Sequence, residues 1–137
     1  MANTINDYIE LHRDKGFKWG SLDCVNFVGK GVNYVGHTFF EKEDDWEYND
    51  ERQAKECLLK LYRKHDVRDL PSLLDKHYDR LPKFPTGGCI VARPVDHDST
   101  TGYLLGFVSG RHGVYVGEES LLFIPLEPDL EMYWRFK

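Results

Sequence analysis

Cys24 is the residue of this chain whose type and position best fit covalent chemistry. It follows a Trp19-Gly20 turn and Ser21, a residue type that caps helices by accepting a hydrogen bond from a first-turn N–H. A helix that begins here carries Cys24 in its first turn. The partial positive charge of a helix N-terminus favours thiolate over thiol, the form that a cysteine nucleophile needs. The alternative is a packing residue, because unpaired cysteine is among the most buried residue types.

The helix that must position Cys24 has one apolar face. Its valines recur at helical spacing, at Val25, Val28, Val32 and Val35. Gly29 and Gly31 lower the helix propensity, so another element must approach too closely to leave room for side chains. We expect that element to be a sheet.

The composition is typical of a single globular domain. The 137 residues are 41% hydrophobic and 14% aromatic, which is enough for one core. The net charge of −5 argues against nucleic acid or an anionic lipid surface as the main partner, because there is no basic excess to release counterions. No apolar stretch is long enough to cross a bilayer, and MANTINDYIE lacks the pattern of a signal peptide. We expect synthesis in a cytoplasm and no membrane insertion.

The cysteines argue against disulfides and metal. Cys24, Cys57 and Cys89 are odd in number and lack CxxC spacing, so neither a disulfide framework nor a structural zinc site is predicted. No cofactor is expected. Cys57 belongs to the apolar stripe of a predicted helix, so we expect it to be buried and unreactive.

Three further helices are predicted before residue 82. The first begins after Asn3 or Thr4 and ends at Gly16. The second spans 51–65, starts at a pair resembling a capping box, Asp50 and Gln53, and has an inward face made of Ala54, Cys57, Leu58, Leu61 and Tyr62.

The last of these helices begins at Leu70-Pro71, with Asp69 as its cap, and runs through Leu81. His77 shares its apolar stripe and is expected to be packed in the core. Between the Cys24 helix and residue 51 lies an acidic segment with the aromatics Phe39, Phe40, Trp46 and Tyr48. It is interpreted as a solvated loop held down by these rings, with the lining of a groove as the alternative.

From Cys89 onward the pattern changes to strands. Short runs rich in Val, Ile, Leu, Phe and Tyr are separated by turn residues, as CIVAR, GYLLGFVS, HGVYVG, SLLFIPL and EMYWRF. The connections at Ser109-Gly-Arg and Gly117-Glu-Glu are of hairpin length, so these strands are antiparallel neighbours. In the last strand, Met132, Trp134 and Phe136 share the face expected to be core. Helices followed by an antiparallel sheet predict an α+β domain.

Several motifs together resemble those of a known superfamily. WGSLDC at a helix start, the strand Gly87-Gly88-Cys89-Ile90-Val91 and the strand from Leu104 to Gly110 are similar to motifs of NlpC-type, papain-like cysteine peptidases, which cut cell-wall peptides. The order WG-x-x-DC, helical insert, LPSLLDKHYDRLP, LGFVSGR, LLFIPL and YWRF resembles the small phage-tail branch of that superfamily over nearly the whole chain. The resemblance implies one NlpC-like domain over 1–137, with a papain-like core and a helical insert at about 37–85.

The resemblance implies a Cys–His mechanism with Cys24 as nucleophile. A thiolate attacks a peptide carbonyl, while a histidine takes the thiol proton and gives it to the leaving amine. In the superfamily this histidine stands at the head of the strand that matches Leu104–Gly110, so Leu104 occupies its place. A leucine cannot transfer a proton.

Two histidines are candidates to replace it. His112 opens HGVYVG, a run that itself resembles the histidine strand, and alternation places it on one face with Val114 and Val116. The second, His97, lies in the loop before Leu104, which would have to fold over the helix terminus. Its neighbours Asp96 and Asp98 suggest a metal site, but three adjacent residues cannot all converge on one ion, so a solvated loop is expected instead.

Two functional hypotheses follow from the resemblance. The first is a phage tail protein, of the tail tip or of tail assembly, with an NlpC-type fold whose catalytic set is degenerate. The second is an active cysteine peptidase or amidase, a hydrolase that cuts peptidoglycan stem peptides during infection. Both imply a virion tail location and other phage tail proteins as partners, and the second adds a peptidoglycan peptide. A third hypothesis, outside the resemblance, is a small intracellular binding module without catalysis.

Overall fold

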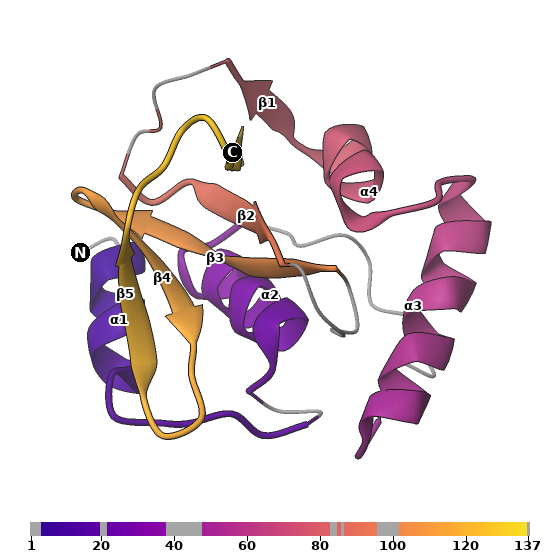
Figure 1. Ribbon diagram of the computed structural model, residues 1–137, viewed down its shortest axis with the longest axis horizontal. Coiled ribbons are helices and arrows are strands. Elements are labelled where there is room, and N and C mark those ends of the chain that lie inside the picture. Colours follow the sequence, from indigo (N-terminus) through magenta and orange to yellow (C-terminus); the bar gives the residue numbers. More distant parts are fainter. Residues whose placement is uncertain are drawn as a thin grey trace.

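The sheet is the frame of the molecule, and helices cover one of its faces (Figure 1). A computed structural model describes residues 4–19, 22–37, 48–82, 85, 87–95 and 102–136. Over these residues the helices are α1 (Ile5–His12), α2 (Cys24–Tyr34), α3 (Glu51–His65) and α4 (Leu70–His77). The strands are β1 (Asp79–Leu81), β2 (Ile90–Pro94), β3 (Tyr103–Ser109), β4 (His112–Val116), β5 (Leu121–Pro125) and β6 (Met132–Arg135). The predicted α+β class, with helices first and strands after, is confirmed.

The sheet has the order β1-β6-β2-β3-β4-β5, and every pair in it is antiparallel. The five strands predicted after Cys89 are therefore confirmed. β1 was not predicted, because its residues continue the helical spacing of α4. The last helix in fact ends at His77, and Asp79 pairs with Arg135 of β6. Pairing with the C-terminal strand thus overrides a local helical pattern that was expected to reach Leu81.

Side-chain caps fix the helix starts. Thr4, Asp50 and Asp69 cap α1, α3 and α4 as predicted, each accepting a hydrogen bond from a first-turn N–H. In α2 the cap is Asp23 rather than the predicted Ser21, which lies outside the described residues. Cys24 is therefore the first residue of α2.

Two further details of the helices differ from expectation. α1 ends at His12 instead of reaching Gly16. Gly16 serves a close approach, since a Cβ there would lie 2.1 Å from the carbonyl oxygen of Glu118. His77, expected in the core, is exposed, and its ring lies 4.8 Å from that of His65.

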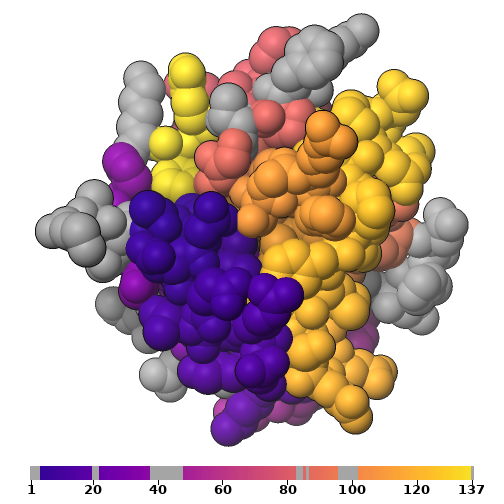
Figure 2. Space-filling model, turned by 90° about the vertical axis from the view of Figure 1, so that its left-hand side faces the viewer, coloured from indigo at the N-terminus to yellow at the C-terminus, as the bar shows by residue number. Residues whose placement is uncertain are grey.

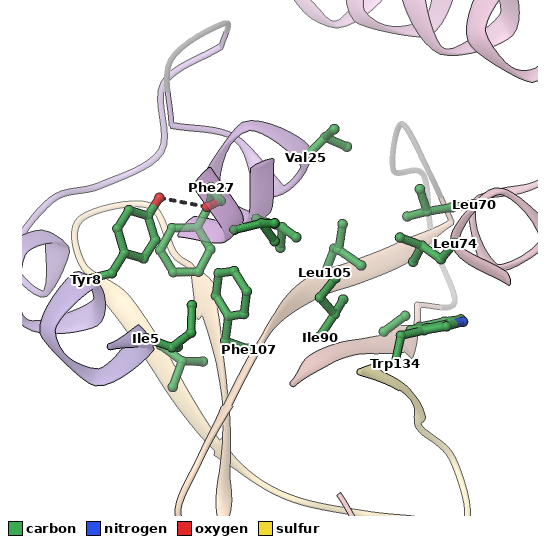
Figure 3. Close-up of a cluster of buried hydrophobic side chains, with 14 of the residues drawn as sticks. Ile5, Tyr8, Val25, Phe27, Leu70, Leu74, Ile90, Leu105, Phe107 and Trp134 are labelled. Carbon is green, nitrogen blue, oxygen red and sulfur yellow. Dashed lines mark hydrogen bonds between the residues drawn. The ribbon is translucent and has the colours of Figure 1, made fainter. Parts of the chain in front are cut away.

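The valine face of α2 packs on the sheet, as predicted from its glycines. A Cβ on Gly31 would lie 2.5 Å from the ring of Phe107 in β3, so only glycine allows this approach. Figure 3 shows side chains from the helices and from the strands meeting in this core. The hydroxyl of Tyr8 donates to the carbonyl of Phe27, 2.6 Å away, and so ties α1 to α2. Trp134, predicted to be core, is fully buried, whereas Met132 and Phe136 are only partly buried.

The far face of the sheet carries a second, smaller core, made of Cys89, Val91, Val108, Tyr115 and Tyr133. The buried carboxylate of Glu131 accepts hydrogen bonds from the hydroxyls of Tyr115 and Tyr133, at 3.1 and 2.8 Å. Tyr133, on the face of β6 opposite to Trp134, is therefore buried as well. These hydrogen-bond donors offset the cost of removing the Glu131 carboxylate from water, as a buried charge requires.

The chain after α1 runs along the β4–β5 hairpin, and Figure 2 shows these segments in contact on one surface. The N–H of Leu121 donates to the carbonyl of Arg13 at 3.0 Å, and the N–H of Phe17 donates to Gly117 at 2.8 Å. The guanidinium of Arg13 lies 4.8 Å from the ring centre of Phe123. These contacts fix the segment that leads to Cys24. No described helix is long and apolar enough to span a membrane.

A candidate site at the start of helix α2

Cys24 opens into a cavity of about 420 Å³. Its side chain is half-buried, at the N-terminus of a helix that packs on the sheet, as the sequence predicted. The cavity walls come from the segment before α2, the start of α3, β3 and the β4–β5 hairpin. The lining residues are Phe17, Trp19, Asp23, Cys24, Val25, Tyr48, Glu51, Ala54, Leu58, Tyr103, Leu104, Val116 and Glu118.

The base of the cavity is organised by Asp23, which is 3% exposed. One oxygen of its carboxylate accepts from the N–H of Asn26 at 3.0 Å and from the hydroxyl of Tyr48 at 2.9 Å. The other accepts from the side-chain amide of Asn26, at 2.9 Å. Burial raises the pKa of Tyr48, and the charge of Asp23 raises it further. Tyr48 therefore stays protonated and fastens the segment before α3 to the start of α2.

Aromatic rings form one wall. The ring of Phe17 packs edge-on against Trp19 with 4.7 Å between centroids, and Trp19 lies 6.4 Å from Tyr48. The alternative interpretation of the acidic segment, that its aromatic residues line a groove, is confirmed for Tyr48, which lines the cavity. Phe39, Phe40 and Trp46 lie outside the described residues. Cys57, predicted to be buried, packs beneath this wall with Tyr48 and Ala54.

Tyr103 and Leu104 both line the cavity, but their side chains pack on opposite faces of the sheet. In the pairing of β2 with β3, Leu104 lies opposite Arg93, and its side chain packs with the far-face core. Tyr103 lies opposite Pro94 and packs against the core that contains α2. The motif match assigns the place of the family's histidine to Leu104, whereas strand alternation from the buried Phe107 places Tyr103 on the α2 side of the sheet.

A second tyrosine lies near the same place. The pKa of Tyr62 is raised, mainly by its burial, with smaller contributions from Asp69, Cys24 and Tyr103. Tyr62 and Tyr103 therefore both stand in the surroundings of the Cys24 thiol. Sequence reasoning missed Asp23 and Tyr103; the DC pair was the available signal for the first and strand alternation for the second.

The structure does not bring His112 and Cys24 together. His112 is exposed at the first position of β4, opposite Ser109, whose hydroxyl donates to Asn6. Val116, at the other end of this strand, is the β4 residue that lines the cavity. At the usual rise of a strand, these two ends are about 13 Å apart.

None of the histidines that the structure describes lines the cavity. His12 bonds to the carbonyl of Tyr8, His37 lies beside Phe136, and His65 and His77 lie against each other. His97 lies outside the described residues, as do Asp96 and Asp98. In the described part of the chain, no group of three or more His, Cys, Asp or Glu is arranged to hold a metal ion, and none of the cysteines forms a disulfide.

The chemistry of the cavity depends on the groups around Cys24 that could accept a proton. Acyl transfer by a thiol needs a group that accepts its proton near neutral pH and then protonates the leaving amine. Among the described lining residues, the ionisable candidates besides Cys24 are carboxylates and tyrosines. Asp23 is engaged by Asn26 and Tyr48, and Tyr48, whose pKa is raised by burial, does not accept a proton at neutral pH.

Comparison with known proteins gives one match. The model of a family described as "Domain of unknown function (DUF6950)" matches residues 1–136. No curated protein and no solved structure matches the chain.

Proposed function

The chain belongs to the DUF6950 family, and we propose that it is a phage tail protein, of the tail tip or of tail assembly, with an NlpC-type papain-like fold that no longer cleaves peptides. The observation that carries the loss of cleavage is that none of the described histidines lines the cavity at Cys24. The strand expected to present a histidine, β3, contributes Tyr103 and Leu104 to this cavity.

The papain-like part of the proposal is supported by the position of the cysteine. Cys24 is the first residue of a helix that packs on an antiparallel sheet, and β3 passes beside that helix start. A Cys–His peptidase needs this arrangement, because the helix terminus favours the thiolate and the strand presents the base. The fold alone carries no activity, so the lining of the cavity must decide the chemistry.

The tail assignment is supported by the order of motifs along the sequence, from WGSLDC to YWRF. The net charge of −5 fits a protein whose partners are other proteins rather than DNA. The assignment is tested by a phage whose copy of this gene carries an early stop codon. Electron microscopy is expected to show absent or defective tails, and normal infectious tails would contradict the proposal.

One observation favours the alternative, an active peptidase or amidase. The thiol of Cys24 is half-buried and opens into a cavity large enough for a peptide side chain. In that case the base would have to be a residue outside the described part of the chain, with His97 the candidate, or His112 after a rearrangement.

The two functions are separated by incubating the protein with purified peptidoglycan and measuring new amino groups with an amine-reactive dye. A catalytically competent NlpC-type enzyme serves as the positive control, and Cys24→Ala as the matched variant. The proposed function predicts the same baseline release for the wild type and Cys24→Ala. Release by the wild type that disappears in Cys24→Ala would establish the alternative, and loss of that release in His97→Ala or His112→Ala would identify its base.

A further inference from the structure

We propose that the cavity at Cys24 binds a lysine or arginine side chain of a partner polypeptide. This inference rests on the proposed non-catalytic function, because it assigns the cavity to recognition. Two observations support it: the charged residues among the described lining are all acidic, and aromatic rings packed against one another line the same cavity.

The charged residues among the described lining all have the same sign. They are Asp23, Glu51 and Glu118, and no lysine or arginine is among the described residues that line the cavity. Asp23 is buried, and its carboxylate accepts hydrogen bonds from Asn26 and Tyr48. Glu51 and Glu118 are exposed, so they lie where the cavity meets solvent, here called its mouth. A cationic group that enters the cavity is therefore attracted by carboxylates in its lining.

The two glutamates at the mouth differ in their surroundings. Glu51 is paired with Lys55 at 3.1 Å, one helical turn along α3, which offsets part of its charge. Glu118 is in the β4–β5 turn, and the neighbouring Gly117 is held by the N–H of Phe17. Its backbone is also packed against Gly16. Glu118 is thus the better positioned partner for an incoming cation.

The aromatic wall suits a side chain that has an apolar stem and a charged head. Phe17, Trp19, Tyr48 and Tyr103 all line the cavity, and Trp19 packs edge-on to both Phe17 and Tyr48. Aromatic faces attract ammonium and guanidinium groups, and the same rings cover the methylene stem of lysine or arginine. A volume of about 420 Å³ holds one such side chain together with part of its flanking backbone.

The charge of the whole chain indicates which polypeptide supplies this residue. With a net charge of −5, two copies repel each other at long range, which disfavours a second copy as the occupant. A partner with a basic segment is attracted both to the chain and to the mouth of the cavity. We therefore assign the occupant to a different protein that presents a lysine or arginine.

The test uses three short peptides and the full chain. Acetyl-glycyl-arginyl-glycinamide carries the cation, its citrulline counterpart has nearly the same shape without charge, and a peptidoglycan stem peptide represents the substrate of the alternative function. Binding is followed by NMR through the indole N–H signal of Trp19, assigned by its loss in Trp19→Phe. We expect the arginine peptide to shift this signal with saturation, and the citrulline peptide to bind at least about fivefold more weakly.

Glu118→Gln is expected to weaken arginine-peptide binding about two- to fivefold, the range for a cation at an exposed acidic and aromatic site. Glu119→Gln is the matched control, because Glu119 is the next residue of the same turn, is exposed and does not line the cavity. Equal binding of the arginine and citrulline peptides, or equal losses in the two variants, would overturn the proposal. Tighter binding of the stem peptide than of the arginine peptide would overturn the assignment to a protein partner.

The outcome is separable from that of the proposed function. Peptidoglycan cleavage that depends on Cys24 would refute the non-catalytic function, whatever the peptides do. If no cleavage occurs and the arginine and citrulline peptides bind with equal affinity, only the recognition of a basic side chain is refuted.

Discussion

Tyr103 lies on the face of the sheet that packs against α2, while its neighbour Leu104 lies on the opposite face, across from Arg93. Of the two β3 residues that line the cavity, the one whose side chain lies on the α2 side is therefore a tyrosine. The motif match assigns the family's histidine to position 104. A histidine introduced at position 103 is therefore expected to act differently from one introduced at position 104.

Tyr103→His is expected to activate the thiol of Cys24, because an imidazole beside a cysteine at a helix N-terminus forms an ion pair with the thiolate. The rate of alkylation of Cys24 by iodoacetamide at pH 7 should rise about tenfold, measured by mass spectrometry of the Cys24 peptide. Leu104→His is the matched variant and should leave the rate close to that of the wild type. Acceleration in Leu104→His alone would show that the faces of β3 are assigned the wrong way round.

Gly31→Ala is expected to destabilise the fold by about 1–3 kcal/mol, since the added methyl group meets the ring of Phe107 at 2.5 Å and that of Tyr8 at 2.8 Å. Gly87→Ala is the control, because no atom lies within 4 Å of a Cβ built there. Urea unfolding of both variants measures the difference. Equal stabilities would mean that α2 does not press on the sheet at Gly31.

Trp134→Ala is expected to cost about 3–5 kcal/mol, because it removes a fully buried aromatic from the core. It also deprives the Asp75 carboxylate of the indole N–H, which donates to it at 2.8 Å. The free energy of unfolding in urea is the measurement. An unchanged value would show that β6 contributes little to the core.

His77 is expected to make the stability depend on pH. Its pKa is lowered, mainly by burial of part of the ring and then by the positive charges of His65 and Lys76. As the pH falls below about 6.5, the unfolded chain takes up this proton before the folded one does, so stability is lost until the pH passes the folded value. Above that range both states are neutral at His77, and it contributes nothing.

The test for His77 is the free energy of unfolding between pH 7.5 and pH 5, measured for the wild type and for His77→Gln. The loss of stability on acidification should be smaller in the variant. The effect is modest, because the residue is exposed. Parallel curves would indicate that His77 does not differ in protonation between the two states.

Local patterns predicted most of the fold. The starts of α3 and α4 follow from the aspartates that cap them, and the five strands after Cys89 follow from β-rich runs between turn residues. What local patterns missed depends on distant partners. β1 exists because Asp79–Leu81 pairs with β6, and Tyr133 is buried because Glu131 and the far-face core cover it.

The candidate site was predicted in part. Cys24 at a helix start follows from the sequence, because the valine stripe is a local signal, although the cap is Asp23 and not the predicted Ser21. The motif match points to Leu104 in β3, and only strand alternation indicates that Tyr103, one residue earlier, lies on the face that packs against α2. Tyr48 reaches Asp23 across 25 positions of sequence, and nothing in the local pattern of either residue indicates that hydrogen bond.

The surroundings of the Cys24 sulfur in a crystal structure of the full chain test the central claim most directly. The proposed function predicts that no imidazole nitrogen of any histidine, His97 included, lies within about 7 Å of this sulfur, and that the Tyr103 side chain occupies the adjoining space. An imidazole nitrogen within hydrogen-bond reach of the sulfur, with a polar group orienting the ring from its other side, would contradict the claim and identify a working catalytic pair.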